Sequence, residues 1–446
     1  MGEKMKKYAD LVEKYRSLML KAEEYLWNNP ETGYREQNTC EYMAREFEKL
    51  GYNLTRARGI TGFYTVFDTG RDGPTVLVLA ELDSLIVHGH KAAKQDSGYV
   101  HACGHHSQMA AILGLAATLS ETGASDGLSG KIKLCVVPAE ELIELEYRNR
   151  LRSEGKIKYF CGKTEFLYRG YFDDCSLALM VHASTQFCVN GGFVGCIAKT
   201  VRFKGVSAHA GGAAWEGVNS LYAATQALGA ANALRETFRE NDYVRFHPII
   251  THGGDAVNAI PELTTLEAFV RAGSIEAMIS YNAKINRALA GAALSMGANV
   301  DIIDTAGYAP LKNDGELMKI AKAAADAVIP EENFKIYTDI SSGSTDMGEL
   351  SQIMPVVHAF CAGAAGRTHG DDYCIADKER ALVKSAKLQF AMLRLLLADN
   401  ARKAKEVAEN FTPHFKNKEE LFEVIDKIQC SGDRIAYGEG RAEVRL

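Results

Sequence analysis

Short apolar runs that alternate with helical patterns are the feature that most constrains the fold of this chain. Apolar residues fill the runs at 75–80, 131–137 and 177–181, which predicts buried strands, and the spacing at 108–119 predicts a helix between the first two. Alternation of this kind is typical of a mainly parallel sheet with helices on both faces. The sequence therefore predicts an α/β fold built on such a sheet.

Side chains that bind divalent metal ions follow each of these three runs. Asp83 follows the first run and His182 follows the third. The second run is followed by two adjacent acids, Glu140 and Glu141. Because the carboxyl ends of parallel strands meet at one edge of a sheet, these side chains are expected to converge. Two acids at the end of an apolar strand are costly to leave unpaired, and a cation would remove that cost.

The segment His101–His106 reads His-Ala-Cys-Gly-His-His, with a single residue between Cys103 and His105. Cysteine, histidine and glutamate side chains are ligands for borderline divalent metals. A lone Cys-Gly-His is more often an ordinary turn, and a lone strand-end His182 or loop His369 is more often structural. Together with the paired acids, which offer a ligand and a neighbouring general base, the set predicts a hydrolytic metal centre.

Residues 191–307 interrupt the alternating pattern with a different order of elements. Strand, helix, strand, strand, helix and strand are predicted in turn, which is the order of a ferredoxin-like α+β unit. The alternating pattern resumes near Leu311, so this unit is predicted to be inserted into the first. We therefore predict a catalytic metal-binding domain of residues 1–190 and 308–446 and an inserted domain of residues 191–307.

Composition argues for a soluble cytoplasmic protein. The formal net charge of −6 disfavours nucleic acid or an anionic membrane as the main partner. No apolar run approaches the ~18 residues that a membrane span needs, and the charged amphipathic start has no apolar signal region. The 10 cysteines include no Cys-x-x-Cys pair, which is typical of a reduced cytosolic enzyme rather than of a disulfide framework.

A set of short motifs spread over about residues 10–400 carries a family resemblance. The motifs are Trp27–Glu36, Ala80–Leu85, His101–His105, Pro138–Glu141, Val181–His182, Gly205–Ala210, Gly253–Pro261, Ser344–Ser351 and Arg367–His369. Together they resemble the metallo-amidohydrolase and peptidase family of aminoacylases, auxin-conjugate hydrolases, bacterial glutamate carboxypeptidase and aminobenzoyl-glutamate hydrolase. The segment Ser344–Ser351 looks most like the aminobenzoyl-glutamate hydrolase and Xaa-Arg dipeptidase branch.

The resemblance implies two divalent metal ions per subunit. Zn and Mn are the expected ions and Co is a further option, because mixed Cys, His and Glu ligation permits all three. Cys103 would bridge the two ions as a thiolate. The full implied ligand set is Cys103, His105, Glu141, His182 and His369.

The resemblance also implies roles for residues that do not bind metal. Glu140 would be the general base that takes a proton from the attacking water and passes it to the leaving amine, and Asp83 would orient a ligand. The inserted domain would be a lid and dimerisation domain. In that domain, His209 would stabilise the oxyanion in the partner's site of a homodimer. Asn258 and Arg271 would hold the substrate, and Arg271 would bind the substrate's carboxylate.

Three departures from the family pattern bear on the site. His106 stands where many relatives have Asp or Asn, and Glu81 stands where the carboxypeptidase branch has a metal-binding His. The segment 142–172 is longer than in the auxin-conjugate branch and carries seven Lys or Arg against four Glu. It either reshapes the acyl pocket or forms a solvated surface helix, and the second reading is favoured.

The predicted function is metal-dependent hydrolysis of the amide that joins an acyl or aryl-acyl group to an amino acid with a free carboxylate. A dipeptidase of the same family is the alternative within enzymes, and an acid placed to meet a substrate amine would favour it. A non-hydrolytic metal- or ligand-binding protein is the alternative of another class. Glu140 argues against the latter, because a protein that only binds needs no base beside its ligands.

Overall fold

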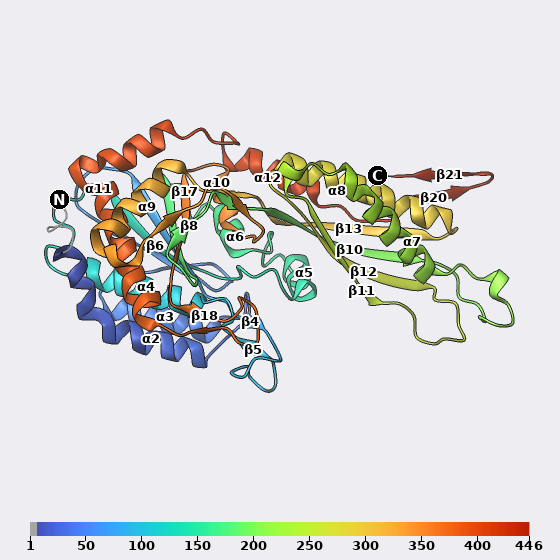
Figure 1. Ribbon diagram of the computed structural model, residues 1–446, viewed down its shortest axis with the longest axis horizontal. Coiled ribbons are helices and arrows are strands. Elements are labelled where there is room, and N and C mark those ends of the chain that lie inside the picture. The colour runs from blue at the N-terminus through green and yellow to red at the C-terminus, as the bar shows by residue number, and fades with distance from the viewer. Residues whose placement is uncertain (1–6, 446) are drawn as a thin grey trace. The chain divides into compact units, whose positions relative to one another are not determined.

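The structure is a computed structural model that describes residues 7–445. The chain forms two compact units, shown in Figure 1. Unit 1 comprises Met1–Gly192, Lys312–Ser341 and Glu349–Lys418, and unit 2 comprises Phe193–Leu311, Ser342–Gly348 and Glu419–Leu446. Within the described residues, no helix is both long and apolar enough to cross a bilayer.

Unit 1 is built on an eight-stranded mixed sheet whose order is β1-β2-β6-β3-β7-β17-β8-β15. The neighbours from β6 to β17 are parallel, whereas β1 and β2 are antiparallel additions at one edge. The strands are β1 Thr55–Arg56, β2 Phe63–Asp68, β3 Thr75–Glu81, β6 Lys131–Val137, β7 Leu177–Ala183, β8 Cys188–Val189, β15 Lys335–Ile336 and β17 Val356–Cys361. The predicted α/β fold on a mainly parallel sheet is confirmed.

The helices of unit 1 cover this sheet and supply most of its apolar core. Every residue of β3 and of β7 is buried, as expected for central strands covered on both faces. The helical elements are η1 Asp10–Tyr15, α2 Arg16–Asn28, α3 Gln37–Lys49, α4 His105–Leu119, α5 Leu145–Ser153, α6 Gly162–Tyr168, α9 Gly315–Val328, η5 Pro330–Glu332, η6 Glu379–Lys384 and α11 Ser385–Asn410. Short strands complete the unit: β4 Leu85–Ile86, β5 Tyr99–Val100, β18 Ala364–Ala365 and β19 Cys374–Ile375.

Helix α4 carries the predicted metal ligands to the sheet edge. It packs against β3 and β7 and is buried along its whole length, which fits its apolar sequence on every face. The helix begins at His105, directly after Gly104, whose φ of 107° lies in the left-handed region that favours glycine. This turn places Cys103 and His105 at the carboxyl ends of the neighbouring strands.

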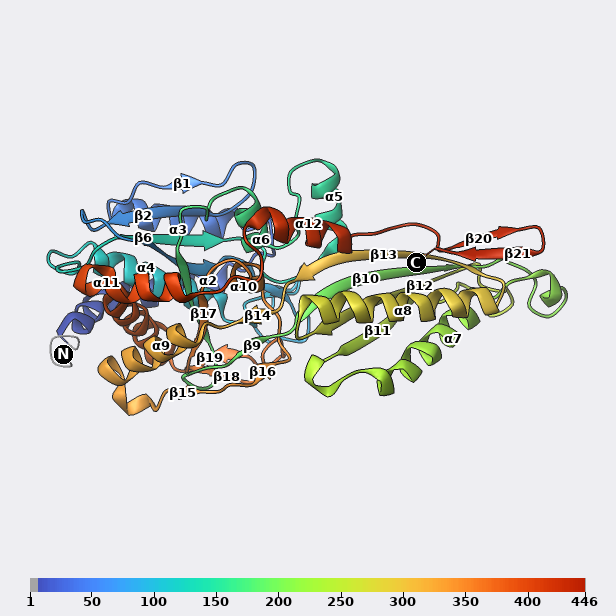
Figure 2. The same cartoon turned by 90° about the horizontal axis from the view of Figure 1, so that it is seen from above.

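Unit 2 contains an antiparallel four-stranded sheet of order β11-β12-β10-β13, and Figure 2 shows α7 and α8 lying along it. The chain order β10, α7, β11, β12, α8, β13 is the predicted ferredoxin-like order. The main elements are β10 Gly195–Lys204, α7 Ser220–Ala233, β11 Arg245–His252, β12 Leu263–Ala272, α8 Ile275–Ser295, β13 Asn299–Tyr308, α12 Lys418–Ile428, β20 Ile435–Gly438 and β21 Arg441–Val444. Short elements are η2 Ala214–Glu216, η3 Leu234–Thr237 and η4 Glu240–Asp242.

Four further short elements lie where the chain passes between the two units. They are β9 Gly192–Phe193, β14 Leu311–Lys312, β16 Ile340–Ser341 and α10 Met347–Ser351.

The C-terminal segment differs from the sequence prediction, which placed residues 308–446 with the metal-binding part. Residues 419–446 group with unit 2 instead. The reason is the free edge of β13, whose backbone groups need partners. The amide of Asp304 donates to the carbonyl of Cys430 at 2.9 Å, and the amide of Arg434 donates to the carbonyl of Val300 at 2.8 Å. The charged tail therefore covers an edge of the sheet.

Candidate metal centre

Five side chains predicted as metal ligands converge in unit 1. Nitrogen, sulfur and oxygen atoms lie within 4.8 Å of one another in three groups of residues. The groups are Cys103 with His105 and His182, Cys103 with Glu141 and His369, and Glu81 with His105 and Glu140. Cys103 is shared by the first two groups, which is the position a bridging ligand needs.

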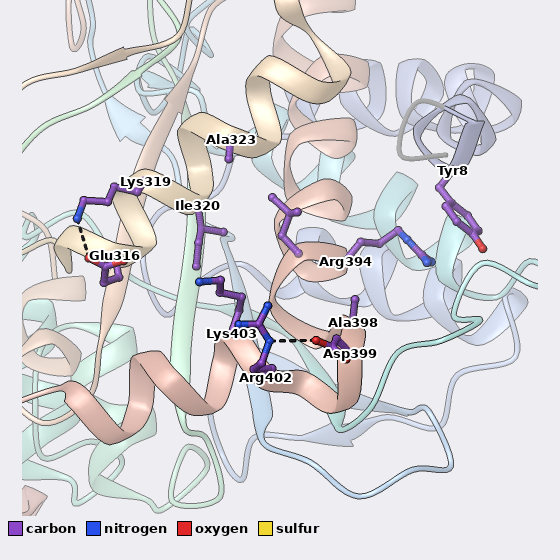
Figure 3. Close-up of a pocket in the computed structure, with 11 residues that line it drawn as sticks. Tyr8, Glu316, Lys319, Ile320, Ala323, Arg394, Ala398, Asp399, Arg402 and Lys403 are labelled. Carbon is purple, nitrogen blue, oxygen red and sulfur yellow. Dashed lines mark hydrogen bonds and ion pairs between the residues drawn. The ribbon is translucent and has the colours of Figure 1, made fainter. Parts of the chain in front are cut away.

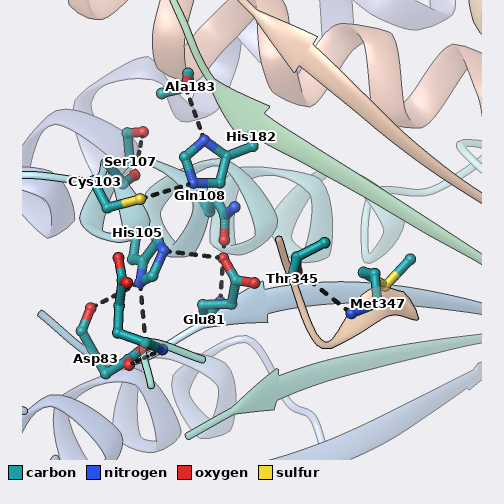
Figure 4. Close-up of polar contacts among 12 residues, drawn as sticks. Glu81, Asp83, Cys103, His105, Ser107, Gln108, His182, Ala183, Thr345 and Met347 are labelled. Atoms are coloured by element: carbon teal, nitrogen blue, oxygen red, sulfur yellow. Dashed lines mark hydrogen bonds and ion pairs between the residues drawn. The ribbon is translucent and has the colours of Figure 1, made fainter. Parts of the chain in front are cut away.

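The two buried imidazoles of the first group both direct Nε2 into this cluster (Figure 4). Nδ1 of His105 forms hydrogen bonds with the backbone oxygen of Asp83 at 2.9 Å and with Oδ1 of Asp83 at 3.1 Å. Nδ1 of His182 forms a hydrogen bond with the carbonyl oxygen of Ala183 at 2.8 Å. Because these oxygens only accept, each Nδ1 carries a proton. Nε2 is therefore left as the ligand atom, the arrangement found for most metal-binding histidines.

Asp83 connects two predicted ligands. Its Oδ1 forms a hydrogen bond with Nδ1 of His105, and its Oδ2 accepts a hydrogen bond from the backbone N–H of Glu141 at 2.8 Å. Asp83 is fully buried, so this geometry is fixed by packing as well as by hydrogen bonds. The position matches the orienting role that the family resemblance implies.

His369 reaches the cluster from a loop held against the Cys103 turn. Its backbone N–H donates to the carbonyl of Ala102 at 2.8 Å, and its Nε2 lies 3.0 Å from Oε1 of Glu141. The φ of His369 is +63°, a left-handed conformation that is unusual outside glycine and marks a constrained turn. Tyr373 from the same loop donates its hydroxyl to the carbonyl of Cys103 at 2.9 Å.

The electrostatics of the cluster are those of a site with excess negative charge. Burial alone raises the pKa of Cys103, but attraction to His105 and His182 outweighs it and holds that pKa well below its usual range. A low thiol pKa favours the thiolate, the form that binds metal. Burial acts to lower the pKa of His369, yet hydrogen bonding and attraction to Cys103 and Glu141 raise it to about 11. Without a divalent cation, the imidazoles take protons to balance the anions.

The residues present fit a divalent metal ion. Within residues 7–445, Nε2 of His105 and Oε2 of Glu81 are buried and have no hydrogen-bond partner. The donor set of one thiolate, three imidazoles and two or three carboxylates is the one that Zn²⁺ and Mn²⁺ accept. Orphaned ligand atoms of this kind are costly in a protein interior unless a cation joins them.

The segment 142–172 differs from the favoured reading of a solvated surface helix. Helix α6 is buried from Gly162 to Leu167, and a Cβ at Gly162 would lie only 1.7 Å from the carbonyl oxygen of Pro138. Arg148 of α5 is fully buried and donates to the backbone carbonyl of Glu141. The segment 142–172 therefore packs against Pro138 and the backbone of Glu141, next to the metal centre.

Two contacts near the centre carry no signal in the local sequence pattern. Lys163 of α6 forms a buried ion pair with Glu81. Glu36 accepts the backbone N–H of Ala139 at 2.8 Å, next to Glu140, and burial together with the charge of Asp83 raises its pKa to about 8. Glu36 stands in the opening motif, but only the structure shows that it touches the strand end that carries the predicted base.

Unit 2 brings His209 and Asn258 together. His209 forms a backbone bridge with Ala259, and the amide of Ala210 donates to the carbonyl of Asn258 at 2.9 Å. Both side-chain positions are exposed.

Arg271 lies elsewhere in unit 2. It is near the far end of β12, paired in register with Cys196, whereas the loop of Asn258 precedes the first residue of that strand, Leu263. At about 3.3 Å per residue, this places Arg271 on the order of 25 Å from Leu263 along the strand. Within one copy of unit 2, Arg271 therefore lies far from His209 and Asn258, whereas the family resemblance implies that all three serve a substrate-bound site.

A cavity of about 470 Å³ in unit 1 is separate from this centre. Figure 3 shows it between α9 and α11, with its charged side chains paired: Lys319 with Glu316 at 2.7 Å and Arg402 with Asp399 at 3.0 Å. No residue of the metal cluster lines it. The cavity is therefore not the candidate active site.

Comparisons with known proteins agree with this geometry. Residues 77–395 match the family model described as Peptidase family M20/M25/M40. An Xaa-Arg dipeptidase of Mus musculus is 28% identical over 377 residues, which cover 78% of this chain and 77% of that protein. An indole-3-acetyl-aspartic acid hydrolase of Enterobacter agglomerans is 27% identical over 328 residues, covering 61% of this chain and 70% of that protein.

A solved structure has the same fold. It is a dinuclear metal-binding peptidase of the M20 family from Bacillus subtilis, which matches with a TM-score of 0.65 and 20% identity. The match covers 86% of this chain and 99% of that one.

Proposed function

Because the chain belongs to peptidase family M20/M25/M40, we propose that it is a two-metal amidohydrolase. Its substrate would be an acyl or aryl-acyl group joined by an amide to an amino acid with a free carboxylate. The predicted family and the predicted reaction class, hydrolysis of an amide or peptide bond, are confirmed by the matches. The observation that carries the proposal is the sharing of Cys103 by two ligand groups, with Glu140 in a third.

In this proposal Cys103, His105, Glu141, His182 and His369 hold two divalent ions, Zn or Mn, with Co as a further option. The ions, when bound, polarise the scissile carbonyl and lower the pKa of the attacking water. Glu140 takes the proton of that water and delivers it to the leaving amine. Asp83 holds His105 and the backbone of Glu141 in place, so both ligands are oriented before substrate binds.

His209 is well suited to donate a hydrogen bond to an oxyanion. Its Nδ1 accepts the backbone N–H groups of Gly211 at 3.2 Å and Gly212 at 2.9 Å. Because these amides only donate, Nδ1 must carry the lone pair and Nε2 must carry the proton. The exposed ring therefore presents a fixed N–H donor, which is what stabilisation of developing negative charge requires.

We propose a homodimer in which His209 and Asn258 serve the partner's site. Strand β11 is a free sheet edge, and its Ile249 is 54% exposed. On helix α7, which packs on the same sheet, Tyr222 is 61% exposed. An edge strand with apolar side chains is a ready surface for an isologous contact. A second copy would also supply His209 and Asn258, whose loops in one copy lie beyond the opposite end of β12 from Arg271.

We also propose a cytoplasmic location. All ten cysteines are free thiols, and four of them are half-buried. Free thiols are stable in a reducing compartment.

The function is tested by amine release from a panel of substrates. Metal-reconstituted protein should hydrolyse N-acyl amino acids or aminobenzoyl-glutamate, and the same substrates with a carboxamide in place of the carboxylate should react poorly. The similarity to an Xaa-Arg dipeptidase favours a dipeptidase as the second candidate. Preference for a substrate with a free amino group would select it, and a protein that binds two ions yet cleaves nothing in the panel would overturn the hydrolase proposal.

The ligand set predicts how metal content responds to substitution. Wild-type protein should contain two divalent ions per subunit, and His105→Ala or His369→Ala should retain about one or fewer, because each removes a ligand of the proposed site. Cys103→Ser should lose both ions more easily, since the bridging thiolate is gone. Elemental analysis per subunit measures this. His88→Ala and Cys175→Ser, which lie outside the cluster, should keep both ions. Full occupancy in all three cluster variants would contradict the assignment.

Arg271→Lys tests the proposed carboxylate contact. Nη1 of Arg271 donates to Oγ of Ser344 at 2.8 Å, and this contact orients the guanidinium. Lysine keeps the charge but loses the planar fork, so KM should rise ~10- to 100-fold with little change in kcat. Arg202→Lys on the same sheet is the matched control. An equal KM increase for a carboxamide substrate would show that Arg271 does not read the carboxylate.

A further inference from the structure

Glu81 is a buried carboxylate of the cluster whose two oxygens have different surroundings. It ends β3 and is 1% exposed, and its backbone N–H donates to Oε1 of Gln108 at 3.2 Å. Its Oε1 forms the ion pair with Nζ of Lys163. Its Oε2 lies 3.3 Å from Nε2 of His105, as Figure 4 shows.

Oε2 of Glu81 and Nε2 of His105 face each other with no hydrogen-bond partner in residues 7–445. Nδ1 of His105 is occupied by Asp83, so Nε2 is the ring nitrogen that faces Glu81. A carboxylate oxygen and an imidazole nitrogen buried this close need a proton or a cation between them. Two ligands of one Zn²⁺ at about 2.1 Å are separated by roughly 3.0–3.4 Å for ordinary coordination angles. The observed separation of 3.3 Å fits a shared ion.

We propose that Oε2 of Glu81 binds the same metal ion as Nε2 of His105, and that Lys163 is the positioning residue that holds Oε1. This inference rests on the proposed two-metal site and adds a ligand to it. Glu81 is thereby limited to one coordinating oxygen. The ammonium group of Lys163 also offsets the charge that a further carboxylate adds beside Cys103 and Glu141.

Lys163 contacts Glu81 because helix α6, within the segment 142–172, packs against the residues that follow β6. Lys163 is fully buried, and the neighbouring Gly162 leaves no room for a side chain against Pro138. Pro138 lies two residues before Glu140, the first of the two adjacent acids. Helix α6 therefore makes two contacts near the metal centre. Gly162 packs against the backbone that leads to Glu140 and Glu141, and Lys163 binds the carboxylate of Glu81.

Metal affinity and the visible spectrum of the cobalt-loaded protein test this ligand. Glu81→Asp keeps a negative charge opposite Lys163 but withdraws the oxygen by one methylene. Glu81→Gln combined with Lys163→Met removes both charges of the pair and leaves no buried ion unpaired. In chelator competition, each should bind one of the two ions at least ~10-fold more weakly. The Co²⁺ absorption bands should shift in both, because the ligands of one ion change.

The opposite result is equally clear. If the Glu81→Gln/Lys163→Met protein binds both ions with wild-type affinity and an unchanged Co²⁺ spectrum, Glu81 is only the structural partner of Lys163. His105→Ala separates this failure from failure of the metal site. If wild-type protein binds no divalent ion, the proposed function is wrong. Suppose instead that the wild-type protein binds two ions, that His105→Ala loses one, and that the Glu81 variants lose none. In that case the metal site stands and only the Glu81 assignment is wrong.

Discussion

Glu140→Gln should lower kcat by at least ~10²-fold while the protein keeps both metal ions. Glutamine has nearly the same shape as glutamate, but its amide does not accept a proton at neutral pH. Glu140 is buried beside His105 and Glu81 and directly precedes the predicted ligand Glu141. The variant should therefore fold and bind substrate with little change in KM. Steady-state kinetics and elemental analysis on the same preparation measure the effect.

Glu141→Gln is the matched control for that experiment. It changes the neighbouring residue in the same way, but it removes a proposed metal ligand and should lower metal content as well as activity. The pair of variants thus separates proton transfer from metal binding. A Glu140→Gln enzyme with wild-type kcat would remove Glu140 from the role of general base.

The parts of the site that could be predicted from sequence are those fixed by strand ends. Asp83, Glu141 and His182 follow buried strands of a parallel sheet, and such strands deliver their carboxyl ends to one edge. The structure places all three in one cluster with Cys103. Periodicity also predicted the order of elements in unit 2, where β12 and β13 alternate buried residues with more exposed ones.

Contacts set by packing between distant segments could not be predicted in this way. Lys163 is one of seven basic residues in a charged insertion, and its burial against Glu81 depends on the tight approach of Gly162 to Pro138. A charged, irregular segment resembles a solvated surface in sequence, whatever it contacts in space. The pairing of the C-terminal tail with the edge of β13 near Asp304 is of the same kind, since it depends on an unpaired strand and not on the tail's own pattern.

Arg271 and Asn258 show that roles implied by a resemblance do not give the distance between two residues. The resemblance implies that both hold the substrate, but most of the 13 positions from Asn258 to Arg271 belong to the extended strand β12. A strand separates its ends by about 3.3 Å per residue, so closeness in sequence becomes distance in space. The backbone bridge between His209 and Ala259 instead places His209 beside the loop of Asn258.

His209→Ala should lower kcat by ~10²- to 10³-fold, the usual effect of removing one oxyanion donor, with metal content unchanged. The Nε2–H group of His209 is fixed by the backbone amides of Gly211 and Gly212 and points away from them. If this donor serves the partner's site, two inactive proteins should restore each other. Mixed His209→Ala and Glu140→Gln chains form heterodimers in which one site has both Glu140 and a partner's His209.

Subunit exchange makes this prediction quantitative. With equal mixing, half of the dimers are heterodimers with one intact site of two, so turnover should recover to about a quarter of wild type. The matched control mixes wild-type chains with chains that carry both substitutions. Its heterodimers should be inactive if His209 acts across the dimer, because the only chain with Glu140 then faces a partner without His209. If His209 serves its own chain, the outcomes reverse: the first mixture stays inactive, and the control heterodimers keep one working site.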